Sequence, residues 1–284
     1  MKRFLIIICM MFLISSCAPK IEDNNKFTIY TSFYAVEKLT EMIAGEKAEV
    51  EMLISSGADV HNWEPSSADM VALNNADLFI YSSNTMEPWA EKVIESIGKP
   101  ELTAVEASGG IVGSGVNTDP HIWLKPENAI LMLENIADAI ITADSVNKEY
   151  YTAQLEDARG ELMALDAEFR AAAEEFADRE IIVTHGAFGY LCEAYGLEQY
   201  VIEGISGESD PSSAKLKEVI DRINEKEIRS VFYVTSESDK VARLIAEETG
   251  ARVFALNTFG SGAGEGYAEV MRENLEVLKE ALNG

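Results

Sequence analysis

The chain has 284 residues and a formal net charge of −26, from 23 basic and 49 acidic residues. So acidic a protein repels nucleic acid and anionic ligands and attracts cations, although acidity also serves the solubility of an exported protein. The length exceeds that at which one hydrophobic core usually suffices, which predicts two domains that fold without a metal or a disulfide.

The first residues predict export. Residues 1–17 combine a basic start with an apolar run that is too short to span a bilayer, as in a secretion signal. The segment LISSC, which ends at Cys17, resembles a bacterial lipobox. That resemblance implies cleavage before Cys17, lipidation of its sulfur, and a membrane-anchored protein outside the cytoplasm, on the periplasmic side if the cell has two membranes. An ordinary secreted protein with a chance cysteine is the alternative.

The cysteines offer no disulfide within the mature chain. Cys9 leaves with the signal and Cys17 would carry lipid, so Cys192 is alone and no CxxC pair exists. Its helical surroundings predict a small core residue.

Apolar, β-branched runs alternate with helical patterns in the first half of the chain, which predicts a parallel sheet flanked by helices. The predicted strands are residues 27–32, 48–54, 76–83 and 101–107, with helices beginning near Tyr34, Pro65 and Pro88.

Two helices are predicted next, over residues 125–143 and 147–176. The second contains only Gly160 as a weak breaker, and at 1.5 Å per residue it would reach roughly 45 Å, enough to join two domains stiffly. The alternative is a helix that bends at Gly160 and packs on one domain.

The second half repeats the pattern of the first. The predicted strands are residues 180–185, 199–205, 229–236 and 251–257, with helices beginning near Phe188, Pro211, Ser238 and Tyr267. The fold class is therefore α/β, with two Rossmann-like four-stranded lobes joined by one long rigid helix. The predicted divisions are a signal at 1–17, a tether at 18–26, an N-terminal lobe at 27–142, a linking segment at 143–178 and a C-terminal lobe at 179–284.

The chain has only three histidines, and each follows a predicted strand. His61 follows residues 48–54 through a glycine turn, His121 follows the loop after 101–107, and His185 ends 180–185. Ligands of open α/β sheets bind at the carboxyl ends of strands, so the three side chains are expected to meet in the cleft between the lobes. A single histidine is more often a core or capping residue, but three of three at strand ends favour a metal site. Neutral imidazoles suit tetrahedral Zn²⁺, whereas Mn²⁺ prefers more carboxylate oxygen.

Six segments, three of which contain the histidines, resemble a known family. They are SGADVHNWEPSSAD, MEPWAEKVIES, DPHIWLKPENA, THGAFGYLCEAYGL, GISGESDPSSAKL and AEETGARVFALNTFG, in this order. They are similar to the ZnuA- or TroA-like solute-binding lipoproteins of zinc and manganese ABC importers. The resemblance implies a monomeric, non-enzymatic binding protein that holds its metal between two lobes and delivers it to a membrane permease and its ATPase. It carries His61, His121 and His185 over as metal ligands. Because the third position is typically glutamate in manganese members, His185 favours zinc.

The fourth ligand departs from the family pattern. An acidic residue is usual at the end of the last strand, and this chain has Asn257 there. Asn257 could ligate through its amide oxygen or simply form a turn, and water could take the place instead. Glu64 is expected to act from outside the ligand shell or to cap a helix.

Three other functions remain open from the sequence. A manganese-binding member of the same import system is one, and a surface adhesin is another. A zinc hydrolase with three histidines and water is the third, although no HExxH or GxSxG motif occurs and only Glu64 is an obvious general base.

Overall fold

A computed structural model describes residues 26–99, 102–111, 119–202, 211–260 and 265–283. The first half of the chain contains four strands and three helices in alternation. These are β1 (Phe27–Thr31), α1 (Tyr34–Ala44), β2 (Ala48–Met52), α2 (Ser67–Asn75), β3 (Leu78–Tyr81), α3 (Ala90–Ile97) and β4 (Thr103–Glu106). A short turn of 3₁₀ helix, η1 (Ile122–Leu124), leads into α4 (Pro126–Ala143), and η2 (Ser145–Asn147) leads into α5 (Lys148–Glu175).

The second half repeats the alternation of strands and helices. Its elements are β5 (Glu180–Val183), α6 (Gly189–Tyr195), β6 (Glu198–Val201), α7 (Ser213–Lys226), β7 (Ser230–Val234), α8 (Lys240–Thr249), β8 (Arg252–Leu256) and α9 (Tyr267–Asn283). The strands and helices expected from the sequence are confirmed, with ends that differ by a few residues. Residue 101 and residues 203–205, at the ends of two predicted strands, lie outside the described residues.

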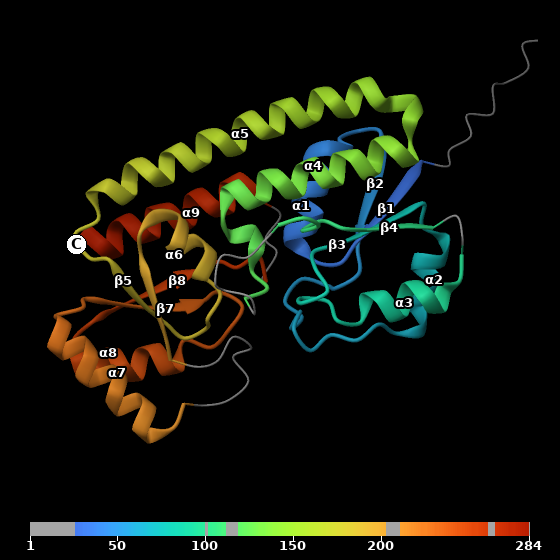
Figure 1. Cartoon of the computed structure of the whole chain (residues 1–284). Coiled ribbons are helices and arrows are strands. Elements are labelled where there is room, and N and C mark those ends of the chain that lie inside the picture. Colours follow the sequence, from blue (N-terminus) through green and yellow to red (C-terminus); the bar gives the residue numbers. More distant parts are fainter. Residues whose placement is uncertain (1–25, 100–101, 112–118, 203–210, 261–264, 284) are drawn as a thin grey trace, which may run out of the picture.

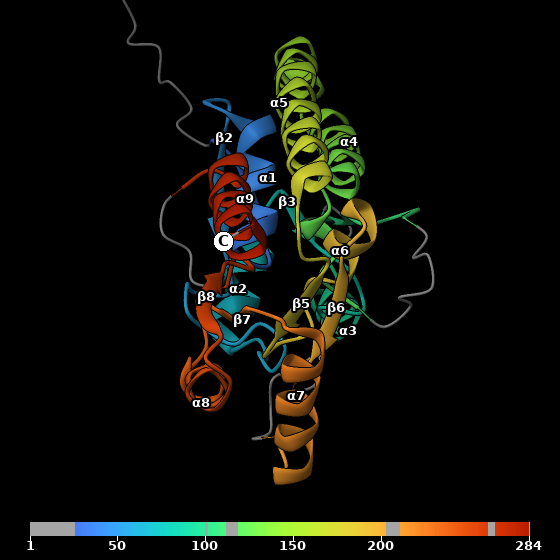
Figure 2. The same cartoon turned by 90° about the vertical axis from the view of Figure 1, so that its left-hand side faces the viewer.

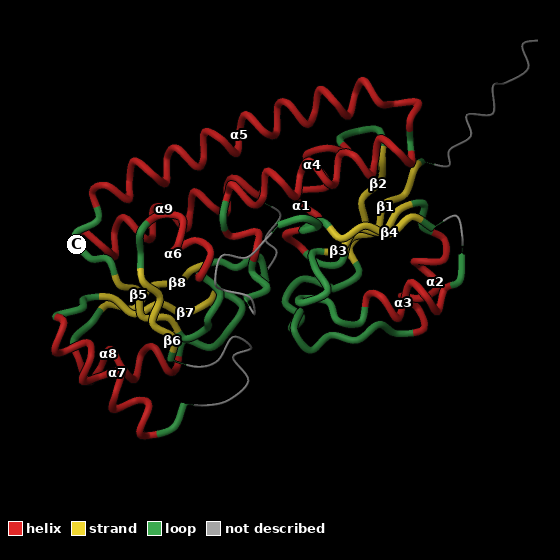
Figure 3. Tube along the Cα trace, in the orientation of Figure 1, coloured by secondary structure: helices red, strands yellow, loops and turns green. Residues whose placement is uncertain are grey.

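The eight described strands form two separate parallel sheets (Figures 1 and 3). The strand orders are β2-β1-β3-β4 and β6-β5-β7-β8, so both sheets have the same topology. All residues of β3 and β5, which lie inside their sheets, are buried, whereas the edge strands β4 and β6 are partly exposed. Apolar strands covered on both faces are typical of parallel sheets, and the predicted two-lobe α/β fold is confirmed.

The helix α5 lies along both halves of the molecule. It contacts α1 and α4 of the first half and α6 and α9 of the second, and in Figure 2 it lies between α9 and α4. Its 28 residues continue through Gly160 without interruption and contact both halves of the chain, so the alternative of a helix bent at Gly160 and packed on one lobe is wrong. A helix of this length extends over about 42 Å, which lets one rigid element join the lobes.

One apolar core passes beneath α5 and joins the two halves. Its buried members include Leu39 of α1 and Ile136 of α4 on one side, and Leu191 of α6 and Leu278 of α9 on the other. A second, smaller cluster fills the space between the second sheet and the helices α7 and α8. Side chains from both lobes therefore pack in one common core, which restricts large changes in the relative position of the lobes.

Hydrogen bonds also connect the lobes near η1. The indole nitrogen of Trp123 donates to the carbonyl of Thr258 at 3.2 Å, and the hydroxyl of Tyr267 donates to the carbonyl of Trp123 at 2.5 Å. The amide of Gly57 donates to the carbonyl of Gly260 at 3.1 Å, which links the loop after β2 to the loop after β8. These contacts hold together the loops at the carboxyl ends of both sheets.

Several predictions from the sequence concern the amino terminus. The signal, Cys17 and nearly all of the tether lie outside the described residues, and the lobe boundaries stay predictions. Within the described part of the chain, none of the helices combines the length and the apolar character that crossing a bilayer requires. Cys192 is buried in the core as expected, and burial raises the pKa of its thiol.

Replacing Gly160 should stabilise the protein. Gly160 is exposed within α5, and a Cβ added there would meet no other atom within 4 Å. Gly160→Ala should therefore raise stability by about 1 kcal/mol, or roughly 2–4 °C in melting temperature, because alanine loses less backbone entropy in a helix. Thermal unfolding measures this, with Gly57→Ala, at φ +82°, as a control expected to destabilise. A lower melting temperature for Gly160→Ala would contradict an unstrained helix at this position.

Candidate metal centre

The three histidines lie in loops at the carboxyl ends of strands. His61 belongs to the loop between β2 and α2, His121 immediately precedes η1, and His185 follows β5 by two residues. His121 and His185 are 2% and 4% exposed, whereas His61 is half-buried. The structure thus brings two ligand candidates from the first half of the chain to one from the second.

Their rings meet in one compact cluster. The Nε2 atoms of His121 and His185 lie 3.1 Å apart, and the three ring centroids are separated by 5.0 to 5.4 Å. One nitrogen from each ring can be chosen so that all three lie within 4.8 Å of one another. Nitrogen atoms so close can share a single cation, since each would need to lie only about 2.0–2.1 Å from a zinc ion.

Asp119 orients His121 from behind. Its Oδ1 lies 2.8 Å from Nδ1 of His121 and also accepts the backbone N–H of the same residue, at 2.9 Å. The carboxylate is almost fully buried. A carboxylate on one ring nitrogen places the imidazole proton there and leaves Nε2 free to bind a metal.

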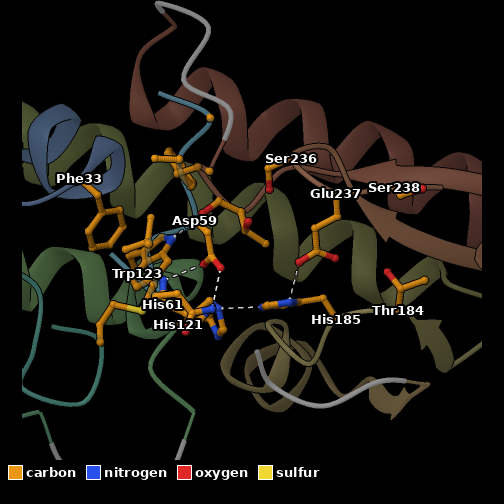
Figure 4. Close-up of a pocket in the computed structure, with 18 of the residues that line it drawn as sticks. Phe33, Asp59, His61, His121, Trp123, Thr184, His185, Ser236, Glu237 and Ser238 are labelled. Atoms are coloured by element: carbon orange, nitrogen blue, oxygen red, sulfur yellow. Dashed lines mark hydrogen bonds and ion pairs between the residues drawn. The ribbon is translucent and has the colours of Figure 1, made fainter. Parts of the chain in front are cut away.

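Glu237 occupies the corresponding place beside His185. Its Oε1 lies 2.8 Å from Nδ1 of His185, and Figure 4 shows His185 between His121 and Glu237. Glu237 lies in the loop after β7, the strand that pairs with β5. The carboxylate is therefore brought to His185 by strand order and not by closeness in the sequence.

The surroundings of His61 keep its ring neutral. Burial, together with the neighbouring rings of His121 and His185, lowers the pKa of His61 to about 4. Burial also lowers the pKa of His121, although Asp119 opposes the shift. Imidazoles that hold no proton on the metal-facing nitrogen are ready to bind a cation at neutral pH.

A cavity of about 680 Å³ opens at this cluster. Both halves of the chain line it, with Phe33, Met86 and Trp123 from the first half and Thr184, Ser236 and Phe259 from the second. Phe33 and Trp123 pack edge to face at 4.8 Å on one side of the histidines. The cluster thus lies in a pocket between the lobes, with an apolar wall on the N-terminal side.

Two further residues that the sequence singled out lie elsewhere. Asn257 does not line the cavity, and its Oδ1 accepts the N–H of Phe259 at 2.8 Å, as in a turn. Glu64 is exposed and likewise lies outside the cavity lining. The structure does not bring either side chain to the three histidines.

Sequence reasoning missed the two carboxylates that contact the histidines. The contact of Asp119 could have been predicted, because an acidic residue two positions before a histidine can fold back onto its ring. Glu237 carried no such signal, since it lies 52 positions from His185 in the printed sequence and meets it only through the pairing of β5 with β7.

The donor set limits the chemistry of the centre. Three imidazole nitrogens suit tetrahedral Zn²⁺, while Mg²⁺, Ca²⁺ and Mn²⁺ favour sites richer in oxygen. The two carboxylates supply negative charge next to the ligands without belonging to the cluster of metal-ligand atoms.

Comparison with known proteins assigns the family. The family described as "Zinc-uptake complex component A periplasmic" matches residues 29–281. The chain belongs to this family. It is 34% identical over 282 residues to the high-affinity zinc uptake system protein ZnuA of Bacillus subtilis, covering 91% of this chain and 88% of that protein.

Solved structures agree with this assignment. The metal-dependent lipoprotein YcdH of Bacillus subtilis superposes with a TM-score of 0.84 at 35% identity, covering 90% of this chain and all of that one. The Zn(II)-bound ZnuA-like domain of Streptococcus pneumoniae AdcA superposes with a TM-score of 0.82 at 30% identity, covering 91% of this chain and 100% of that domain. The family members with this fold therefore include a zinc-bound one.

The low pKa of His61 predicts a pH dependence for the metal-free protein. Folded His61 takes up a proton only near pH 4, whereas an unfolded imidazole does so near pH 6.5, so acid favours the unfolded state between these values. The stability that neutral His61 contributes is complete above pH 6.5 and is lost as the pH falls toward 4.

The melting temperature of the unaltered protein should therefore fall more between about pH 7 and about pH 4.5 than that of the His61→Asn variant. Thermal unfolding with a chelator present measures the difference. Equal losses in the two proteins would show that the ring titrates normally in the folded state.

Proposed function

We propose that this protein captures Zn²⁺ outside the cytoplasm and delivers it to an ABC-type permease. The observation that carries the proposal is the convergence of three histidine nitrogens within 4.8 Å from both lobes. Membership of a zinc-uptake family and the likeness to a zinc-bound domain support it. In this role zinc is the cargo and not a resident cofactor.

The three histidines are proposed as the protein's ligands, with water in the fourth position. Asn257 does not line the cavity and its Oδ1 accepts the N–H of Phe259, so ligation by Asn257 would require its side chain to move. A water molecule needs no such change, because the cluster opens into the cavity. An all-nitrogen protein donor set also favours zinc over manganese.

Release of the ion requires His185 to separate from His61 and His121. The common apolar core and the continuous helix α5 oppose wide opening of the lobes. Small shifts of loops and strand ends are therefore the proposed route, with the half-buried His61 the first ligand accessible from solvent.

Delivery also requires a place at the membrane. We propose that the signal in residues 1–17 directs export and that a lipid on Cys17 tethers the protein beside its permease. Both rest on the lipobox-like sequence. A single binding protein with lipid attached would remain close to the transporter without crossing the bilayer.

Isothermal titration of Zn²⁺ into the metal-stripped chain without residues 1–17 tests the function. One tight site per chain is expected, with far weaker binding of Mn²⁺. His185→Ala should weaken Zn²⁺ binding more than about 100-fold, because even residues behind the ligands typically contribute 10–100-fold.

Glu64→Gln serves as the matched control. It removes a charge near His61 in the sequence, but Glu64 is exposed and outside the cavity, so affinity should not change. The absence of a stoichiometric site, or equal binding by His185→Ala, would overturn zinc capture by this cluster.

A further inference from the structure

The two ring nitrogens of His185 face different partners. Its Nε2 lies 3.1 Å from Nε2 of His121, on the side where the cation would bind. Its Nδ1 lies 2.8 Å from Oε1 of Glu237, on the opposite side (Figure 4). A ring that binds a metal through Nε2 must carry its proton on Nδ1, so Nδ1 needs an acceptor.

Glu237 is the group placed to provide that acceptor. His185 is 4% exposed, and in the described part of the chain its Nδ1 has no hydrogen bond of normal alignment. The Glu237 oxygen lies within hydrogen-bond distance of Nδ1, so alignment of this side chain, which is 30% exposed, would complete the bond. A buried donor without an acceptor is costly, which favours the aligned arrangement once the ring is fixed by a metal.

In the N-terminal lobe the corresponding hydrogen bond, from a histidine Nδ1 to a carboxylate, is already formed. There Asp119 contacts Nδ1 of His121 through a hydrogen bond, and its side chain is 1% exposed. His61 differs from both, because Asp59 accepts its backbone N–H and not a ring nitrogen. Each lobe thus supplies one histidine that has a carboxylate on its outer nitrogen.

Charge gives the second argument for Glu237. The cluster of metal-ligand atoms among the described residues contains three histidines and no acidic side chain. A divalent cation held by neutral ligands in a largely buried pocket is stabilised by negative charge close to those ligands. Asp119 and Glu237 together supply two such charges, one in each lobe.

We propose that Glu237 is the positioning residue of the C-terminal lobe, which fixes the proton of His185 on Nδ1 and turns its Nε2 toward the cation. The proposal rests on the proposed function as a zinc-capture protein. Because Glu237 and His185 belong to the ends of different strands, β7 and β5, a shift between these ends would loosen His185 without moving the N-terminal ligands.

Zinc titration of Glu237 variants tests the proposal in the chain without residues 1–17. Glu237→Ala should weaken Zn²⁺ binding by about 10–100-fold, the usual effect of removing a partner behind a metal-bound histidine. The Zn²⁺ affinity of Glu237→Gln should lie between those of the unaltered chain and of Glu237→Ala, because the amide oxygen can still accept the Nδ1 proton but carries no charge.

The matched control is Glu247→Gln, which removes the same charge from an exposed position on α8 of the same lobe. Its affinity for zinc should equal that of the unaltered chain. If Glu237→Ala also binds zinc as tightly as the unaltered chain, Glu237 has no role at the site and the proposal is wrong.

Long-range ¹H–¹⁵N NMR of the three histidine rings separates positioning from general structural damage. In the zinc-loaded protein His185 should carry its proton on Nδ1, and in metal-free Glu237→Ala its tautomers should become mixed while the signals of His121 stay unchanged. A loss of affinity without any change in the His185 tautomer would overturn the positioning role.

Zinc binding by the unaltered chain separates an error in the role of Glu237 from an error in the proposed function. If the unaltered chain binds no stoichiometric zinc, the function itself is wrong. If the unaltered chain binds zinc and Glu237→Ala binds it equally well, only the role of Glu237 is wrong.

Discussion

The close approach of His121 to His185 is the interaction on which the metal centre depends. Their Nε2 atoms lie 3.1 Å apart although the residues belong to different lobes and are 64 positions apart. If the two lobes moved freely, each binding event would have to order them, and that loss of entropy would weaken capture of the ion. The apolar core beneath α5 and the hydrogen bonds of Trp123 fix the two lobes relative to each other when the chain folds, before any ion binds.

The electrostatics of the pocket follow from that arrangement. Burial and the neighbouring rings of His121 and His185 lower the pKa of His61 to about 4, which keeps its ring neutral near pH 7. The buried carboxylate of Asp119 has one oxygen that accepts no hydrogen bond within the described residues. Such a charge is costly in a protein interior unless a cation lies nearby, so a divalent ion beside His121 would offset it. The pocket therefore combines neutral ligands with nearby negative charge.

The sequence predicted most of the fold because its signals were local. Alternating apolar runs indicated the strands, and the absence of proline between residues 147 and 176 indicated α5. The histidines could be placed at strand ends because parallel strands bring their carboxyl ends to one edge of a sheet. Side-chain direction was not accessible in this way. Asn257 faces the backbone of Phe259, and Glu237 reaches His185 through the strand order of the second sheet. The contact of Glu237 with His185 is a tertiary one that no spacing in the sequence expresses, whereas Asn257 accepts from a residue only two positions away, in the turn that is one of the alternatives the sequence allows.

Anomalous diffraction at the zinc absorption edge would show directly whether one zinc ion lies between the lobes on the three histidines. Crystals of the zinc-loaded chain without residues 1–17 should show one strong anomalous peak, about 2.0–2.1 Å from a ring nitrogen of His61, His121 and His185. A peak that contacts only one of these rings, or one that lies outside the cavity, would show that the three histidines do not share one zinc ion.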